Sequence, residues 1–399
     1  MPVLGCVDDL LAAASCGKAS LDLNIFINSK IEAKKLNFHL PDEKGQSKCK
    51  YLHIGPVSRE CPPLQVHGTD MQKVDSVQYL GDWIQCSGSN KQNVTQRVSR
   101  GLGAVTQIMS ILESVSLGHH YYTIATLLRD SLLVNSMLSS VEVWYNLRFK
   151  EISELSSVDK ILLTQLFSSK KSTPEEGYYL EMGAMPFSVM IKARRIKYLF
   201  YLVTRDESTM LFKFFKEQWN NTYKEDWTNQ IRKDLTDFNI SCDFSWIKSK
   251  RKQWFKQYVN QKAKLFALAS LKRRQQTHSK IKLINYDELK IQNYLTDERT
   301  SLKEKRLVFG FRMRMLSFGE NFRGARPAVP CPFSCPMARD SESHLFDCLP
   351  VNSEGSSGIK SEDFLQDEIP VENIKKLQQL MRRRESLLEQ KVPNFNVYG

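Results

Sequence analysis

Apolar residues change their spacing near residue 90, and this change predicts a small mixed region followed by a long helical one. Before that point, short apolar runs predict strands at Lys50–Gly55 and over Val77–Ile84, and helical spacing predicts one helix at Leu21–Leu36. After that point, apolar residues recur every three or four positions, which is the period of an amphipathic helix. The expected fold is therefore α+β, with a small antiparallel sheet followed by a mostly α-helical part.

The helical part is expected to contain six helices. Five follow from the apolar spacing alone, over 94–112, 121–138, 153–167, 189–202 and 371–390. The sixth begins at Thr173, because Thr is a good N-cap, Pro174 suits the first turn and Glu176 stands three residues after the cap. In the helix at 153–167, the expected apolar face comprises Leu155, Val158, Ile161, Leu162 and Leu166.

Composition and charge indicate a globular protein with a polyanionic partner. Hydrophobic residues make up 41% of the 399 residues and aromatic residues 10%, which is typical of a folded protein. The net charge of +13 favours nucleic acid over an anionic membrane surface. The sequence has neither a long apolar run nor a signal-peptide pattern, so we expect an intracellular protein, nuclear or cytoplasmic, that is neither secreted nor membrane-bound.

Two adjacent acids, Asp8 and Asp9, lie between short apolar runs at the start of the chain. This pattern predicts a hairpin tip that presents paired carboxylates to a divalent metal, because Mg²⁺ prefers oxygen ligands and two-metal sites need several carboxylates. The alternative is a solvated acid pair that caps a helix, since acids are favoured at helix N-termini. The dipeptide by itself leaves both interpretations open.

A series of short motifs follows these acids in a fixed order. After Cys6-Val7-Asp8-Asp9 come a helix, the segment Lys48–Gly55 and Tyr79-Leu80-Gly81. The later motifs are Leu128–Leu133, Glu142–Tyr145, Ser172–Glu176, Tyr179–Gly183 and the pair Arg194-Arg195. Together they resemble the second half of the palm and the thumb of non-LTR (LINE-type) retrotransposon reverse transcriptases, to about residue 350. The family has an aromatic residue where this chain has Cys6.

The resemblance implies a domain order and a set of site residues. The implied domains are a partial palm (1–90), a helical thumb (91–168), a basic helical connector (169–325), a Cys/His knuckle (326–350), and a flexible linker with a C-terminal amphipathic helix (351–399). Asp8 and Asp9 would bind the catalytic Mg²⁺, and Tyr79, Leu80 and Gly81 would hold the primer end. The residues before Asp8 are too few to supply the strand that carries the family's further aspartate. We therefore expect no polymerisation by this chain alone.

Cys331, Cys335, His344 and Cys348 form a cluster of metal-ligand types within 18 residues. Three thiolates and one imidazole can enclose one tetrahedral Zn²⁺, and the cluster is similar to the Cys-Cys-His-Cys segment near the C-terminus of these reverse transcriptases. The family usually has two residues between the first two cysteines, and this chain has three. The alternative is a set of unligated thiols, which fits a chain with nine cysteines, an odd number, in a reducing compartment.

The stretch 244–286 contains twelve lysines and arginines and no acid. Its two basic triplets are Lys250-Arg251-Lys252 and Lys272-Arg273-Arg274. Such triplets can neutralise phosphates, and Trp254 or Tyr258 can stack on bases. The alternative is that the aromatic residues pack in the core while the charges face solvent. The stretch predicts a nucleic-acid site in which the role of the aromatic residues stays open.

The preferred hypothesis is a truncated RNA-directed DNA polymerase polypeptide of a non-LTR retroelement that keeps its nucleic-acid binding. Its partner would be RNA or an RNA–DNA hybrid, bound with steep dependence on salt. A competing hypothesis is a helical protein-interaction scaffold, whose apolar faces, including that of the C-terminal helix, dock a protein partner. A third is a decayed retroelement product without activity.

Overall fold

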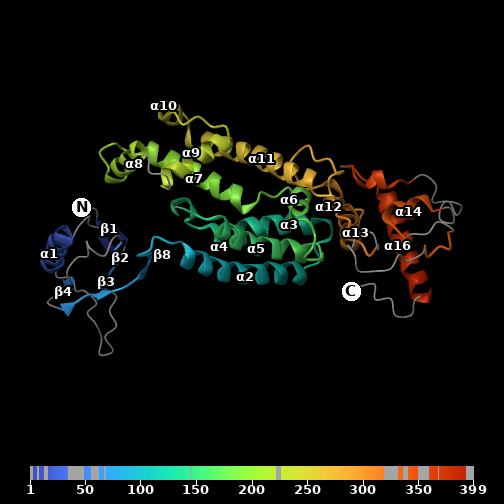
Figure 1. The fold of residues 1–399 in the computed structure, drawn as a ribbon, viewed down its shortest axis with the longest axis horizontal. Helices are drawn as coiled ribbons and strands as arrows, with labels where there is room; N and C mark the ends of the chain where they lie inside the picture. Colours follow the sequence, from blue (N-terminus) through green and yellow to red (C-terminus); the bar gives the residue numbers. More distant parts are fainter. Residues whose placement is uncertain are drawn as a thin grey trace. The chain divides into compact units, whose positions relative to one another are not determined.

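The computed structural model describes most of the chain, which folds into two compact units. The described residues are 3–6, 9–12, 17–34, 49–54, 63–66, 69–144, 146–221, 226–318, 331–335, 340–348, 359–366 and 368–391. Unit 1 comprises residues 1–98, 143–151 and 201–230, and unit 2 comprises residues 99–142, 152–200 and 231–399. Figure 1 labels most of their helices and several of their strands.

Unit 1 contains strands, as the sequence predicts, but within the described residues they form four separate pairs and not one small antiparallel sheet. Each described sheet is a single pair of strands, and three of the four pairs are antiparallel. The pairs are β1 (Val3–Cys6) with β2 (Asp9–Ala12), β4 (Gln65–Val66) with β5 (Thr69–Asp70), β7 (Ser76–Tyr79) with β8 (Asp82–Gln85), and the parallel pair β3 (Lys50–Tyr51) with β6 (Gln72–Lys73). The expected helix near 21–36 is α1 (Gly17–Ala33).

The expected strand over Val77–Ile84 is instead a hairpin of β7 and β8. Leu80 and Gly81 form its turn, with φ values of 49° and 88°. Two-residue hairpin turns of this kind need positive φ at both central positions, which favours Gly at the second. The apolar side chain of Leu80 hides this turn from the sequence pattern, because Leu rarely adopts positive φ.

The hairpin is fixed to the first turn of α2 (Lys91–Ser114). The side chain of Asn93 accepts a hydrogen bond from the backbone nitrogen of Trp83 (2.7 Å) and donates one to its carbonyl oxygen (2.8 Å). Arg97 forms an ion pair with Asp82 at 2.7 Å. A third strand would form hydrogen bonds with the backbone of Trp83, and the side chain of Asn93 forms them instead. The hairpin is therefore held by α2.

Unit 1 also contains α8 (Met210–Asn220), whose N-cap Thr209 accepts a hydrogen bond from the backbone nitrogen of Phe212. Phe212 and Phe215 are buried, whereas Met210, Leu211 and Phe214 are exposed. This helix therefore has apolar residues on more than one face.

Unit 2 consists of packed helices joined by short turns. The expected helix over 121–138 is a continuous helical run of α3 (Tyr121–Leu128), the π-helical turn η3 (Arg129–Leu133) and α4 (Val134–Leu138), preceded by the 3₁₀ turn η2 (Gly118–His120). A π turn contains more residues than an α turn. It keeps the buried positions before and after it on one side of the helix.

The helical run from α3 to α4 packs closely on its neighbours. A Cβ added at Gly101 of α2 would lie 2.0 Å from the sulfur of Met137 and 3.1 Å from Val158 of α5 (Phe149–Leu166), so a larger residue there would require these side chains to shift. In α5 the expected apolar face is buried except for Ile161, which is 39% exposed, while Leu163 is buried. Ile161 lies farthest from the mean direction of that face at 100° per residue, so including it was wrong.

The helix expected at Thr173 is α6 (Glu175–Met182), with Pro174 at the N-cap and no side-chain cap. The hydroxyl of Thr173 is buried and forms no hydrogen bond within the described part of the chain. The prediction that Thr173 caps this helix was therefore wrong, because the helix begins one residue later than the motif predicts. At its other end Gly183 adopts φ 62°, and a Cβ there would lie 2.3 Å from the backbone of Lys290.

The remaining helices of the chain follow in order. They are α7 (Phe187–Val203), α9 (Trp227–Asp237), α10 (Phe244–Lys248), α11 (Lys252–Thr277), α12 (Asn293–Thr296), α13 (Leu302–Arg312), α14 (Glu342–Asp347), the 3₁₀ helix η7 (Ser361–Phe364) and α16 (Val371–Lys391), with the 3₁₀ turn η4 (Val141–Val143) before α5. No described helix is long and apolar enough to span a membrane.

An aromatic cluster lies at the centre of unit 2. Phe167 stacks on Phe309 at 3.8 Å between ring centroids and on Tyr122 at 4.9 Å, and Tyr178 stacks on Phe309 at 5.5 Å. All four rings are nearly or fully buried, and they come from α3, the end of α5, α6 and α13. Segments far apart in sequence therefore share one core.

The C-terminal region packs onto this core more extensively than the sequence predicts. Phe364, in the segment expected to be a flexible linker, is fully buried, and the guanidinium of Arg312 donates to its carbonyl oxygen at 2.8 Å. The expected C-terminal helix is α16, which contacts α13. Its apolar face is buried through Ile374, Leu377, Leu380, Met381 and Leu388.

Candidate nucleic-acid interface and metal centre

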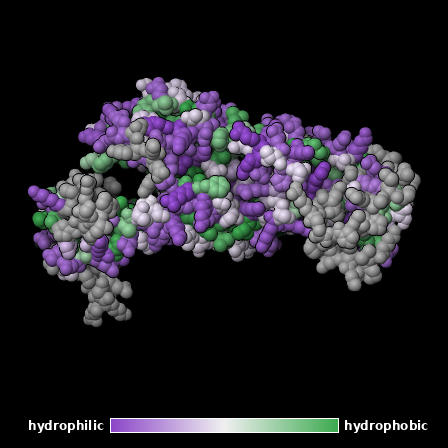
Figure 2. Space-filling view, viewed as in Figure 1, coloured by the Kyte–Doolittle hydropathy of each residue, from purple (hydrophilic) through white to green (hydrophobic). Residues whose placement is uncertain are grey.

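The basic stretch forms α10, α11 and the turns that follow. The side of α11 that packs on the core has one residue in every four: Phe255, Val259, Ala263, Ala267, Leu271 and Gln275. Phe255 stacks on Phe200 of α7 at 4.9 Å between centroids. Because this stripe packs on the core, the lysines and arginines of α11 lie on its other sides. Figure 2 shows mostly hydrophilic residues over α9 and α11, with small hydrophobic spots among them.

The two basic triplets occupy the two ends of α11. Lys252 and Arg274 are separated by 22 positions, which corresponds to about 33 Å on an α-helix. Arg251 and Lys252 are exposed, and neither forms an ion pair within the described residues. This end of the helix therefore offers cations that nothing described neutralises.

Two members of the second triplet bind other residues of the protein. Lys272 donates from Nζ to the carbonyl oxygen of Tyr286 at 2.9 Å, and Arg274 forms an ion pair with Glu176 at 3.3 Å. Arg273 is exposed. Of the predicted nucleic-acid residues, those at the N-terminal end are thus the most available.

Cations also crowd along the middle of α11. Lys197 of α7 donates from Nζ to Asn260 at 2.6 Å. Burial, followed by the charges of Arg194 and Lys256, lowers the pKa of Lys197. The contribution of Arg194 and Lys256 means that these three basic side chains lie near one another.

The aromatic residues of the stretch divide between the two roles left open by the sequence. Phe255 is fully buried in the helix stripe. Trp254 instead stacks on Tyr258, with ring centroids 5.0 Å apart and planes 10° apart, and remains 44% exposed. Phe255 therefore has a packing role in the core, whereas the side chain of Trp254 is accessible at the basic end of the helix.

The motif arginines Arg194 and Arg195 have structural partners. Arg194 donates to the carbonyl oxygen of Leu138 at 2.7 Å, and Arg195 forms a buried ion pair with Asp234 of α9 at 2.7 Å. Burial raises the pKa of Asp234, although the charge of Arg195 opposes it. These two arginines therefore join α7 to its neighbours and are not part of the interface.

Three of the four predicted zinc ligands lie together. The ligand atoms of Cys331, His344 and Cys348 are within 4.8 Å of one another, and both cysteines are buried. Cys335 is half-buried and lies outside this group. His344 is positioned by α14, whose N-cap Ser341 accepts a hydrogen bond from the His344 backbone nitrogen at 3.0 Å.

The geometry of this group fits a metal ion. The sulfurs of Cys331 and Cys348 are 3.7 Å apart, too far for a disulfide. Two sulfurs bound tetrahedrally at about 2.3 Å from one Zn²⁺ lie about 3.8 Å apart. Nε2 of His344 is buried and makes no hydrogen bond within the described residues, which leaves its lone pair available as a ligand. The group can therefore bind a metal ion and is compatible with Zn²⁺.

Contacts with α16 hold the segment that carries these ligands. Arg384, which is fully buried, forms an ion pair with Asp340 and donates to the carbonyl oxygen of Ser317 at 3.2 Å. The guanidinium of Arg383 lies 5.5 Å from the ring centroid of the buried Phe333. The sequence pattern does not predict this support, because the partners lie 44 to 67 positions apart in the chain.

The predicted polymerase residues are only partly described. Asp8 lies outside the described residues, and Asp9 begins β2 opposite Cys6. The expected hairpin is present, and its sheet has two strands within the described residues. Tyr79 ends β7, and Leu80 and Gly81 form the exposed turn after it.

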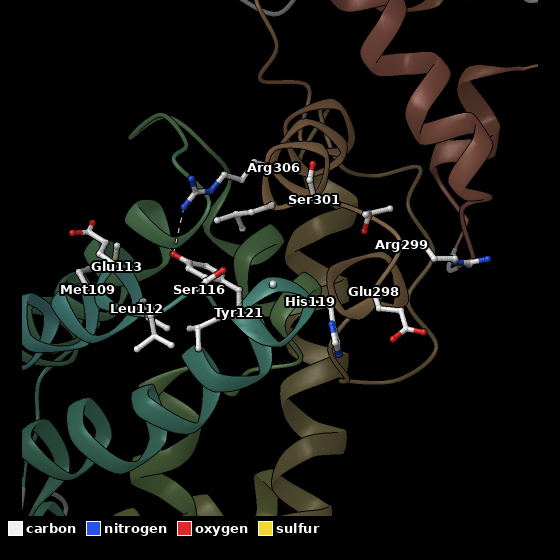
Figure 3. Close-up of a pocket in the computed structure, with 15 residues that line it drawn as sticks. Met109, Leu112, Glu113, Ser116, His119, Tyr121, Glu298, Arg299, Ser301 and Arg306 are labelled. Atoms are coloured by element: carbon white, nitrogen blue, oxygen red, sulfur yellow. Dashed lines mark hydrogen bonds between the residues drawn. The ribbon is translucent and has the colours of Figure 1, made fainter.

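The sequence did not predict a pocket of about 680 Å³ in unit 2. It lies between the end of α2 and the start of α13, where Arg306 donates to the hydroxyl of Tyr121 at 3.4 Å (Figure 3). Arg306 also donates to the carbonyl oxygen of Leu166 at 3.1 Å. Burial raises the pKa of Tyr121, and Arg306 partly offsets this. Glu113 and Glu298 also line the pocket, so its charge is mixed and favours no ligand class.

Comparisons with known proteins add no relatives. No protein-family model, curated protein or solved structure matches the chain.

Proposed function

We propose that the chain is a nucleic-acid-binding polypeptide of non-LTR reverse-transcriptase origin that binds RNA or an RNA–DNA hybrid through α11. The observation that carries the proposal is the accessible basic end of α11, where Arg251 and Lys252 are exposed in a stretch without a single acid. Phosphates bound there would release counterions, which favours binding at low salt.

Polymerisation is not part of this proposal. Two-metal phosphoryl transfer needs several carboxylates held in a fixed arrangement. Asp8 lies outside the described residues, and the β1–β2 sheet has two strands within them. The proposal is therefore limited to nucleic-acid binding. Mg²⁺ would have a role only where a complete carboxylate site forms.

Zinc would have a structural role in this proposal. Cys331, His344 and Cys348 would hold the ion, with Cys335 as the fourth ligand after an adjustment of the 331–335 turn. Bound zinc would supply cross-linking between that turn and α14, as structural zinc does in small domains.

The protein-scaffold alternative receives less support. It relied partly on the C-terminal helix, but the apolar face of α16 packs within unit 2. A partner would have to displace α13 to reach that face. The exposed cations of α11 need no such displacement.

The test is a titration of the full chain with a labelled RNA and with an RNA–DNA hybrid over a range of salt concentrations. Binding is expected to weaken steeply with salt, and the double variant Arg251→Ala/Lys252→Ala is expected to reduce the salt slope by about 2, since each phosphate contact contributes about 1. The matched control is Lys213→Ala/Lys216→Ala, which removes two exposed cations from α8. Absence of binding at low salt, or equal effects of both double variants, would contradict the proposal.

A further inference from the structure

We infer that the N-terminal end of α11 contains a stacking site for unpaired bases of a single-stranded nucleic acid, centred on Trp254. The inference rests on the proposed nucleic-acid binding and specifies which form of nucleic acid this end of the helix takes. It joins three observations: an exposed indole, rings that hold it in place, and cations around it.

The indole of Trp254 is accessible although it belongs to a helix with a well-packed face. The buried stripe passes through Phe255 and Val259, one position away from Trp254 and Tyr258. Trp254 retains 44% of its surface exposed. Large aromatic residues are usually buried, so an exposed one in a basic region is an informative exception.

Neighbouring rings fix the orientation of the indole. Tyr258 lies parallel to it at 5.0 Å, and Trp246 of α10 meets it edge-on at 6.3 Å. Trp246 also contacts Tyr258 at 5.8 Å and the buried Phe255 at 6.3 Å. The three exposed or half-buried rings are thereby anchored to the core. A ring held in place loses little conformational entropy when a ligand stacks on it.

Cations surround these rings. Nζ of Lys250 lies 5.1 Å from the centroid of Trp246 and 5.5 Å from that of Trp254, and Nζ of Lys262 lies 5.5 Å from that of Tyr258. Arg251 and Lys252 are exposed beside them. A base on the indole would therefore bring its flanking phosphates within reach of ammonium and guanidinium groups.

This combination favours single strands over duplexes. Aromatic rings with a positive surround bind single-stranded nucleic acid, because every unpaired base offers a π face. In a duplex the base faces are covered by stacking on their neighbours, so a duplex can use the cations but not the indole. A protein partner could also use an exposed Trp, but the lack of acids in this stretch leaves the surrounding cations best matched to phosphates.

The experiment compares binding of a labelled single-stranded RNA and a duplex of equal length to the full chain. Trp254→Ala is expected to weaken binding of the single strand by about tenfold, to leave duplex binding nearly unchanged and to leave the salt slope unchanged, since stacking involves no counterion release. Trp254→Phe is expected to restore most of the loss. Leu265→Ala is the matched control, because Leu265 is an exposed apolar residue (58%) of the same helix.

The outcomes separate this inference from the proposed function. If neither nucleic acid binds the wild-type chain, both fail together. If both bind but Trp254→Ala has no more effect than Leu265→Ala, the stacking site is refuted while binding through α11 stands. If Trp254→Ala weakens both forms equally, Trp254 supports the helix instead of stacking on bases, and the inference is again wrong.

Discussion

Arg312 donates from Nε to Oε1 of Glu181 over 2.7 Å, and both side chains are fully buried. The same carboxylate oxygen accepts a hydrogen bond from the hydroxyl of Tyr286 at 2.5 Å, and Arg312 also donates to the carbonyl oxygen of Gln366 at 2.9 Å. Burial alone would lower the pKa of Arg312, but the charges of Glu181, Tyr286 and Tyr294, together with the hydrogen bond to Glu181, outweigh burial and raise that pKa. The ion pair therefore joins α6, α13 and the segment after η7.

Removing one member of this pair should strongly destabilise the protein. Glu181→Leu leaves the guanidinium of Arg312 buried without a counter-charge, and we expect a loss of about 3–5 kcal/mol in the free energy of unfolding. Denaturant unfolding provides the measurement. The control is Arg299→Gln, which breaks an exposed ion pair with Asp297 and should cost less than about 1 kcal/mol. Similar losses for the two variants would show that the buried pair has no special role.

Gly183→Ala should destabilise the end of α6. Its φ of 62° costs an L-residue about 1–2 kcal/mol, and the added methyl would lie 2.3 Å from the backbone of Lys290. Gly103→Ala is the matched control, because nothing lies within 4 Å of its added Cβ. In the helix interior of α2 this change should stabilise by about 0.5–1 kcal/mol. Thermal unfolding should move the two variants in opposite directions, and a shift of both in the same direction would be inconsistent with this account.

The Cys/His group should bind about one zinc ion per chain, and binding should depend on each of its members. Cys348→Ser is expected to abolish stoichiometric metal, measured by elemental analysis of the purified protein. Cys335→Ser is expected to weaken binding while leaving the ion bound at saturation, because Cys335 lies outside the preformed group. Cys242→Ser is the control, since this exposed cysteine is remote from the cluster in sequence. A folded wild-type chain that takes up no metal would refute the site.

Lys305→Met should stabilise the protein. The ammonium of Lys305 is buried and makes no hydrogen bond within the described residues, so its removal should gain about 1–3 kcal/mol at neutral pH. Burial lowers its pKa below the ordinary value of 10.5, and the charge of Asp297 offsets this only in part. Denaturant unfolding of both proteins at neutral pH provides the first measurement.

The gain from Lys305→Met should also depend on pH in a defined direction. Between the lowered pKa of the folded state and 10.5, the unfolded chain binds more protons than the folded one. Wild-type stability relative to the variant therefore rises as the pH rises through this window, and the difference narrows. A difference that stays constant up to pH 10.5 would mean that Lys305 keeps its charge in the folded state.

The sequence pattern predicts helices better than it predicts their ends and contacts. Periodicity locates α2, α5 and α16, because each has one long buried face. It also locates α7, although that helix is buried or half-buried on almost all sides. It errs at Ile161, where an apolar residue faces solvent, and at Thr173, where a good cap residue stands one position too early. The residue at which a helix begins is uncertain by one or two positions, and cap residues in the sequence do not determine it by themselves.

The candidate sites were predictable where their residues are close in sequence. The Cys/His spacing indicates the metal group, and the acid-free stretch indicates the basic helix. The exclusion of Cys335 from the preformed group, the partners of Lys272 and Arg274, and the exposure of Trp254 all depend on tertiary packing. The pocket beside Arg306 combines segments nearly 200 positions apart, so no local pattern announces it.

The π turn at Arg129–Leu133 makes this segment unusually tolerant of the loss of one residue. Because a π turn holds one residue more than an α turn, such a loss would convert the run into a regular α-helix without changing the relative orientation of the parts before and after it. Met137 would then keep its place against the glycine of α2. The same deletion within the regular helix α3 would rotate everything after it by roughly 100° and misalign the buried side chains.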